Sequence, residues 1–203
     1  MRGFTIIIPA YANDGHPKSK YHFAEVGGMI KNAIESVYNQ RYINFEILVC
    51  SDGDNEKIKE LVEDYEDPRI KYHFVEHEGE IGGCRSQNEM MQIAEKDLII
   101  HLDQDNTIYR NCFFRILEEW DDETGLLIFR INHQVGIIPV GEKIEHRNID
   151  LLNGATKTSI AKQCEMANIA PSADSRYYKQ AEEICKIEGY KVKFIKDVLG
   201  VHN

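Results

Sequence analysis

The sequence lacks any run of about 18 or more apolar residues, the length that a membrane-spanning helix needs. Its opening, Met1 to Phe4, has neither the apolar stretch nor the cleavage site of a signal peptide. Basic residues are also fewer than acidic ones, 24 against 34, so the formal net charge is −10. That balance argues against binding nucleic acid through overall charge and leaves open only a local basic groove. These absences favour a cytoplasmic protein and leave open a peripheral association with a membrane.

Cysteine is scarce and widely spaced. The five cysteines form no C-x-x-C pair, and an odd number does not suit a framework of paired disulfides. Three of them lie within apolar periodic patterns. This usage favours reduced core thiols over a zinc site or a disulfide framework. The cysteines are Cys50, Cys84, Cys112, Cys164 and Cys185.

The remaining composition is that of a soluble globular domain. Hydrophobic residues make up 42% of the chain and charged residues 29%. A length of 203 residues is most simply one domain, and no repeat or low-complexity linker divides it. The excess of carboxylates supplies groups that could hold a divalent cation.

The first part of the chain alternates between strand and helix patterns. Apolar runs predict buried strands at 4–8 (stopped by Pro9), 45–50 and 97–102, and a further strand is predicted at 69–75. Apolar stripes with helical spacing predict helices at 26–40, 58–65 (with Asp54 or Asn55 as N-cap), 83–94 and 113–120. Such alternation requires parallel strands joined by crossover helices, so this part is predicted to be a doubly wound α/β sheet.

The second part is less regular. Strands are predicted at 126–131, 191–195 and 198–201, and helices at 158–167 and 175–188, with Gly189 as the stop of the latter. Residues 133–153 contain glycine and proline without a clear period, which indicates an extended, partly looped segment.

Two acidic triplets follow predicted strands. Ligands of doubly wound sheets bind beyond the carboxyl ends of the strands, which selects residues 9–28, 51–55, 75–83 and 103–106. The triplet Asp103-Gln104-Asp105 lies there, as does Asp52-Gly53-Asp54. Two carboxylates at such an edge form the oxygen-rich site that Mg²⁺ or Mn²⁺ prefers. The alternative is that residues 103–105 only form a turn and helix cap.

Several segments together resemble a known family. These are Phe4-Thr-Ile-Ile-Ile-Pro-Ala-Tyr11, Ala33-Ile-Glu-Ser-Val-Tyr-Asn-Gln40, Phe45-Glu-Ile-Leu-Val-Cys-Ser-Asp-Gly53, residues 82–88 with Ala94, and Leu102-Asp-Gln-Asp-Asn106. In this order and spacing they resemble the family-2 nucleotide-sugar glycosyltransferases. The resemblance implies a single GT-A-like α/β domain over 1–203: a Rossmann-like, doubly wound mixed sheet with helices on both faces. Residues 1–120 would form the nucleotide-sugar-binding half, and 121–203 the half that binds the acceptor and supplies the catalytic base.

The resemblance also implies roles for single residues. Those matching the nucleotide-binding positions are Pro9, Ala10, Tyr11, Asp52, Gly82, Gly83, Arg85, Asp103 and Gln104. Asp52 would accept a hydrogen bond from a uracil-type base. Arg85 lies two positions before the usual arginine of the family, where Gln87 stands here. Ser51 and Asp54 also depart from the family pattern, which usually has Asp and Ser there.

The metal and the base follow from the same resemblance. Asp105 would bind a divalent cation, Mn²⁺ or Mg²⁺, with Asp103 and His202 as further ligands. The donor would be a nucleoside-diphosphate sugar, with UDP favoured. Asp174, just before an amphipathic helix, would be the base that deprotonates an acceptor hydroxyl in an inverting single displacement; its alternative role is a helix N-cap.

The acceptor is not specified by any motif. Asp150 and Asn153 occupy positions where acceptor-facing residues lie in the family, and a glycan, a lipid-linked sugar, a protein side chain or a modified nucleic-acid base all stay open as acceptors. A nucleotidyltransferase that makes sugar nucleotides is an alternative, but the loop 9–15 lacks the glycine cluster typical of that class. A non-catalytic nucleotide-sugar-binding protein is a third reading, disfavoured by the presence of Asp103, Asp105 and Asp174 together.

Overall fold

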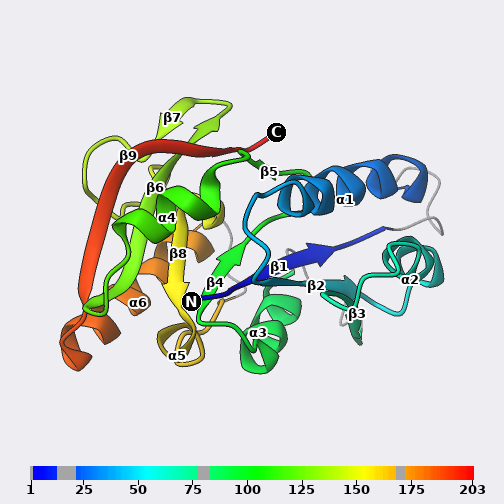
Figure 1. The fold of residues 1–203 in the computed structure, drawn as a ribbon, viewed down its shortest axis with the longest axis horizontal. Coiled ribbons are helices and arrows are strands. Elements are labelled where there is room, and N and C mark those ends of the chain that lie inside the picture. The colour runs from blue at the N-terminus through cyan, green and yellow to red at the C-terminus, as the bar shows by residue number, and fades with distance from the viewer. Residues whose placement is uncertain (1, 13–21, 77–82, 168–171) are drawn as a thin grey trace.

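A computed structural model describes residues 2–12, 22–76, 83–167 and 172–203. Within these residues the strands form one nine-stranded sheet in the order β3-β2-β1-β4-β8-β6-β9-β5, with β7 paired to β6 (Figure 1). The strands are β1 Phe4–Ala10, β2 Phe45–Asp52, β3 Ile70–Val75, β4 Leu98–His101, β5 Thr107–Ile108, β6 Thr124–His133, β7 Gly136–Ile138, β8 Gly154–Lys157 and β9 Lys191–Val201. The helices are α1 Phe23–Tyr38, α2 Glu56–Glu63, α3 Cys84–Ile93, α4 Cys112–Glu119, the 3-10 turn η1 Leu151–Asn153, α5 Thr158–Ala161 and α6 Ala173–Glu188.

The sheet is parallel in its first half and mixed in its second. Strands β3, β2, β1 and β4 are all parallel, with Phe4 opposite both Phe45 and Leu98. Strand β8 then pairs antiparallel with both β4 and β6, and β9 runs parallel to β6 and antiparallel to β5. The predicted parallel sheet therefore extends only through β4, and the sheet as a whole is mixed, as the family resemblance implied.

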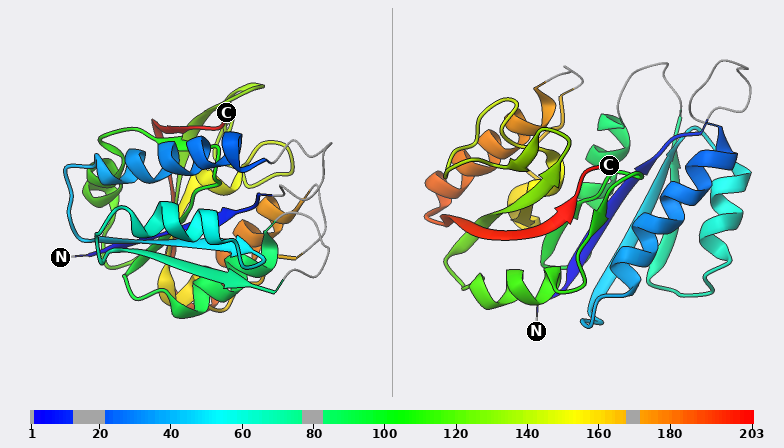
Figure 2. Two further views of the ribbon diagram at one scale, coloured as in Figure 1. Left: turned by 90° about the vertical axis from the view of Figure 1, so that its right-hand side faces the viewer. Right: turned by 90° about the horizontal axis from the view of Figure 1, so that it is seen from above.

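Helices cover both faces of the sheet (Figure 2). An apolar core lies between the sheet and the helices on each face. One core joins α1, α2 and α4 to the sheet through buried residues such as Ile30, Ile58 and Phe113. The other joins α3, α5 and α6 through residues such as Met91 and Ile160. None of the described helices is long and apolar enough to cross a membrane.

Strand β1 continues through Pro9, which the sequence predicted to stop it. The carbonyl of Ile7 accepts from the N–H of Leu102 at 2.9 Å, so Ile7 faces the β4 side of β1. Pro9 faces the same side two residues later. Because β4 has already ended at His101, the missing N–H of Pro9 costs no ladder hydrogen bond there.

The second half departs from the predicted elements in three ways. The short strands β5 and β8 were not predicted, α5 ends at Ala161 and so falls short of residue 167, and the two predicted final strands are one continuous strand, β9. The pairing of β9 with β6 contains register irregularities between Ile128 and Ile131. They occur where β9 includes its polar residues 196 and 197, so that the strand continues beyond them. Other boundaries agree within a few residues. Asn55 is the N-cap of α2 and accepts from Ile58 N–H at 3.2 Å, and Gly189 ends α6 with a left-handed φ of 79°.

A buried carboxylate stabilises the edge of the sheet opposite the predicted ligand site. Glu46 on β2 accepts from the hydroxyl of Thr5 at 2.7 Å, from the N–H of Glu95 at 2.8 Å and from the ammonium of Lys71 at 3.1 Å. Burial alone would raise the pKa of Glu46, but the hydrogen bonds from Glu95, Thr5 and Lys71 outweigh it and hold that pKa below its ordinary value.

We expect Glu46→Gln to lower the free energy of unfolding by about 1–3 kcal/mol at neutral pH, because hydrogen bonds to a buried charge are lost. The pKa of Glu46 is lower in the folded than in the unfolded chain. Its contribution is therefore complete above the unfolded-state pKa and disappears as pH falls through the folded-state pKa. Urea titrations should show the gap between wild type and variant narrowing in acid. Glu95→Gln, at a carboxylate that is 68% exposed, is the control and should cost less than about 0.5 kcal/mol. A gap that stays constant with pH would contradict this account.

Candidate active site

The triplet Asp103-Gln104-Asp105 directly follows β4, at the carboxyl end of the parallel strands. Asn106 N–H donates to the carbonyl of Asp103 at 2.9 Å and closes the turn. Gln104 ties this turn to the loop after β1, because its side-chain carbonyl accepts from the N–H of Tyr11 at 2.8 Å. The triplet is therefore held in place by its neighbours along the sheet edge.

The end of the chain lies against this triplet. Strand β5 places Thr107 opposite Val201 of β9. Beyond that pair, the side-chain amide of Asn203 donates to the carbonyl of Asp105 at 2.7 Å. The N–H of His202 donates to the carbonyl of Asn132 on β6 at 2.9 Å. Two strands thus fix the backbone of His202 next to the acidic turn.

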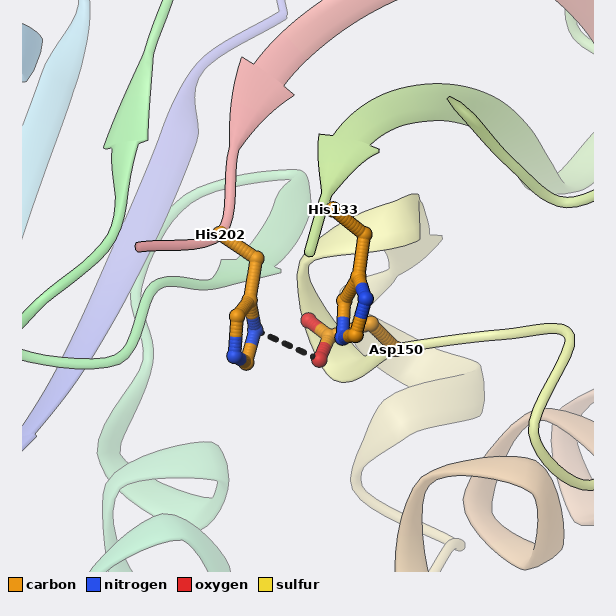
Figure 3. Close-up of side chains that lie close together, drawn as sticks. All are labelled: His133, Asp150 and His202. Carbon is orange, nitrogen blue, oxygen red and sulfur yellow. Dashed lines mark ion pairs between the residues drawn. The ribbon is translucent and has the colours of Figure 1, made fainter. Parts of the chain in front are cut away.

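The side chain of His202 lies with Asp150 and His133 (Figure 3). The Nδ1 atom of His202 is 3.0 Å from a carboxylate oxygen of Asp150, and the two imidazole rings are 4.3 Å apart between centroids. Potential ligand atoms of the three residues all lie within 4.8 Å of one another. In the described part of the chain this is the only such group, and it does not include Asp103 or Asp105. The carboxylate in contact with the ring of His202 is that of Asp150, and the role of His202 as a ligand beside Asp105 stays a prediction.

Negative charge accumulates around Asp103. Burial raises the pKa of Asp103 to about 7, assisted by the charges of Asp150, Asp174 and Asp105 and partly offset by His202. The pKa of His202 is raised in turn, first by the carboxylate of Asp150 in contact with it and further by the charges of Asp105 and Asp103. Four carboxylates and one imidazole thus share a small region at the carboxyl ends of the strands.

Asp174 is the second residue of α6 and faces this region. The N-cap of α6 is Ser172, so the alternative that Asp174 caps the helix is wrong, although its carboxylate still lies in the first turn. Burial raises the pKa of Asp174 to about 6, and the charge of Asp150 adds to the rise while His202 opposes it. A carboxylate with such a pKa holds a proton more readily than an exposed one.

The candidate nucleotide-binding residues surround the ends of β1 and β2. Pro9 and Ala10 end β1, and Asp52 ends β2, where it is partly exposed. Gly83 is the N-cap of α3 and has a left-handed φ of 67°, and an added Cβ there would lie 2.9 Å from the Cβ of Pro9. Only glycine allows this close approach between the start of α3 and Pro9 at the end of β1.

Three further candidates are placed differently or not described. Arg85 lies on the exposed side of α3, bonded to Glu89 at 3.0 Å and to the carbonyl of Glu76 at 3.2 Å, whereas Gln87 is buried. Gly82 lies outside the described residues. Asn153 is fully buried, and its amide donates to the carbonyls of Phe129 and Ile138, which places it within the fold.

Residues 5–165 match the family model described as glycosyl transferase family 2. The chain belongs to glycosyl transferase family 2. Its similarity to curated members is moderate. It is 28% identical to an uncharacterized glycosyltransferase of Rickettsia bellii over 136 residues, 66% of this chain and 19% of that protein. It is 31% identical to the putative glycosyltransferase EpsH of Bacillus subtilis over 101 residues, 49% of this chain and 28% of that protein. The matches therefore span under a third of these relatives.

Solved structures of similar fold cover nearly the whole chain. Staphylococcus aureus TarS 1–349 superimposes with a TM-score of 0.75 at 15% identity, over 99% of this chain and 60% of that one. The mannosyltransferase PcManGT of Pyrobaculum calidifontis, in complex with GDP-Man and Mn²⁺, gives a TM-score of 0.67 at 15% identity, over 99% of this chain and 56% of that one. These likenesses show that this family-2 chain has the GT-A fold.

One residue of the cluster was not predicted from the sequence of this family-2 chain. His133 ends β6 and has no second histidine at metal-ligand spacing, so nothing local marks it. It reaches the site because β6 and β9 run in parallel, with Asn132 paired to Val201, and the two following residues are His133 and His202. Only the register of two distant strands brings these imidazoles together.

Proposed function

We propose that this chain transfers a sugar from a nucleoside-diphosphate sugar, with UDP favoured, to an acceptor hydroxyl with inversion. The observation that carries the proposal is the convergence of Asp103, Asp105, Asp174 and His202 at the carboxyl ends of the sheet strands. The relatives support the donor class: TarS has been solved with UDP-GlcNAc, and PcManGT with GDP-Man and Mn²⁺.

The donor set suits a divalent cation. Asp103 and Asp105 offer hard oxygen atoms and His202 offers an imidazole nitrogen, a combination that Mn²⁺ accepts well and Mg²⁺ accepts less readily. Burial, and after it the charges of neighbouring carboxylates, raises the pKa of Asp103, and a bound cation would relieve the repulsion among those carboxylates. When bound, the cation neutralises the growing charge on the departing diphosphate.

Asp174 is the proposed base. It would take the proton of the acceptor hydroxyl as the oxygen attacks the sugar carbon, and the carbon–oxygen bond to the diphosphate breaks on the opposite side. A single displacement of this kind inverts the configuration of that carbon. The raised pKa of Asp174 brings the base nearer to neutral pH, where general bases work best. The acceptor would approach from the half formed by residues 121–203.

The donor half would hold the nucleotide between the loops after β1 and β2. Pro9, Ala10 and Tyr11 would pack on the base and ribose, and Asp52 would accept a hydrogen bond from the edge of the base. The close approach of Gly83 to Pro9 places the start of α3 beside the loop after β1. Gln104 holds the backbone of Tyr11 and so would shape the nucleotide site without contacting the base.

A donor panel with an Asp52 variant tests this function. Calorimetry with UDP, GDP and UDP-sugars in Mn²⁺ should show selective binding of uridine nucleotides to wild type. Asp52→Ala should weaken UDP by about 10- to 100-fold, the value of a hydrogen bond to a charged group, and should raise KM with little change in kcat. Asp64→Asn, at the C-cap of α2, is the control. Absence of any nucleotide binding by wild type would refute the proposed function. A fall in kcat at constant KM would remove Asp52 from the base-binding position.

A further inference from the structure

Asp150 is held rigidly on the side away from His202. One of its carboxylate oxygens accepts from the N–H of Leu152 at 2.9 Å and caps the turn η1. Its own N–H donates to the side-chain carbonyl of Asn153 at 2.7 Å, and Asn153 is anchored by two buried backbone carbonyls. The carboxylate is therefore fixed by the fold, and only its second oxygen faces His202.

The contact with Asp150 favours a proton on one nitrogen of His202. The Nδ1 of His202 lies 3.0 Å from the carboxylate oxygen. Their angle is not that of a formed hydrogen bond, but the negative charge at this distance favours a proton on Nδ1. A neutral ring then has its lone pair on Nε2, which points away from Asp150 in Figure 3. A carboxylate that fixes the tautomer of a histidine in this way is the usual partner of a metal-binding imidazole.

His133 is less suited than His202 to bind the cation. Its Nδ1 accepts from the N–H of Val135 at 3.2 Å, so in the neutral ring the proton lies on Nε2. Figure 3 shows His133 beside Asp150 and His202. Binding an ion through Nε2 would require the loss of the Val135 hydrogen bond and a change of tautomer, a cost that His202 does not carry.

From these contacts we infer that Asp150 is a positioning residue, which orients His202 and keeps its Nε2 available to the divalent cation held by the Asp103–Asp105 turn. This inference rests on the proposed function, in which His202 is a ligand of that cation. Asn203, the neighbour of His202, already bonds to the carbonyl of Asp105, so the chain at His202 is held beside the turn. Asp150 itself would contact neither the cation nor the donor.

Asp150→Asn tests the inference with little change to the fold. Asn caps a turn as well as Asp, and its single oxygen is needed by the N–H of Leu152. Its NH₂ group must then face His202, and two donors would meet unless the ring moves its proton to Nε2. We therefore expect the variant to unfold at the same urea concentration as wild type but to hold His202 in the wrong tautomer.

Two measurements follow. Long-range ¹H–¹⁵N NMR of the metal-free chain in mildly alkaline buffer, assigned with His202→Gln, should show Nδ1–H in wild type and Nε2–H in Asp150→Asn. Calorimetry of Mn²⁺ with UDP should show the Mn²⁺ affinity of Asp150→Asn reduced by about 10- to 100-fold. His133→Gln should stay within about threefold of wild type, and Asp105→Asn should lose the ion.

Each result has a definite reading. An unchanged tautomer or an unchanged Mn²⁺ affinity in Asp150→Asn overturns the inference. A second result also overturns it: His133→Gln loses as much Mn²⁺ affinity as Asp150→Asn, while Asp105→Asn still binds Mn²⁺. In that case His133, Asp150 and His202 would be the direct ligands. Failure of wild type to bind UDP with Mn²⁺ refutes the proposed function, while the tautomer in the metal-free chain still shows whether Asp150 orients His202.

Discussion

Replacing Asp105 with alanine should abolish metal-dependent binding of UDP. Asp105 ends the acidic turn after β4 and would supply a carboxylate directly to the cation, so its loss should reduce Mn²⁺ affinity by about 100-fold or more, beyond the effect of residues that only support ligands. Transfer should fall by about 10²–10³-fold, because the charge on the departing diphosphate would lose its preorganised counter-charge. Calorimetry with and without Mn²⁺ and steady-state kinetics measure both effects.

The other acidic triplet provides the matched control. Asp54 also ends a D-x-D sequence at the same edge of the sheet. However, it lies beyond β2, and its carboxylate accepts a hydrogen bond from the hydroxyl of Tyr72 at 3.3 Å. Asp54→Asn should keep the Mn²⁺ affinity of wild type. Equal metal-dependent affinity in Asp105→Ala and wild type would remove Asp105 from the metal site, and a loss confined to Asp54→Asn would move the site to the first triplet.

The sequence was most informative where local pattern and sheet topology agree. Strands β1, β2 and β4 are buried and largely apolar, and the ends of parallel strands meet at one edge, so the location of Asp103 and Asp105 was predictable. Strand β5 has two residues and β8 has four. Segments this short show no period, yet β5 is what holds the end of β9 beside the acidic turn.

Side-chain contacts in the second half of the chain could not be predicted from the sequence for a related reason. The proximity of His202 to the acidic turn was expected from the family resemblance, but its contact with Asp150 depends on three separate pieces of structure. These are the pairing of β9 with β6, the pairing of β9 with β5, and the capped turn that begins at Asp150. Local sequence indicates each of these three features only weakly. All three together bring the Nδ1 of His202 to 3.0 Å from the carboxylate of Asp150.

Replacing Asp174 with asparagine should stop transfer while leaving the donor site intact. A base acts only when the acceptor proton leaves, so UDP and Mn²⁺ should bind as in wild type. Transfer should fall by about 10²–10⁴-fold, the usual contribution of general base catalysis. Single-turnover assays with a matched acceptor, alongside calorimetry with UDP and Mn²⁺, separate chemistry from binding.

The stability of Asp174→Asn gives a second readout with a definite sign. Burial and the charge of Asp150 raise the pKa of Asp174 to about 6 in the folded chain, so above that pH the ionised carboxylate destabilises the fold relative to the unfolded chain. Asparagine avoids this cost, and the variant without metal should therefore unfold at a temperature no lower than that of wild type at neutral pH. Glu182→Gln, on the exposed side of the same helix, is the control for loss of a carboxylate and should keep full activity. Near-normal transfer by Asp174→Asn would exclude Asp174 as the base and direct the search to Asp150 or His202, whereas a stable, donor-binding and inactive variant would assign the base to Asp174.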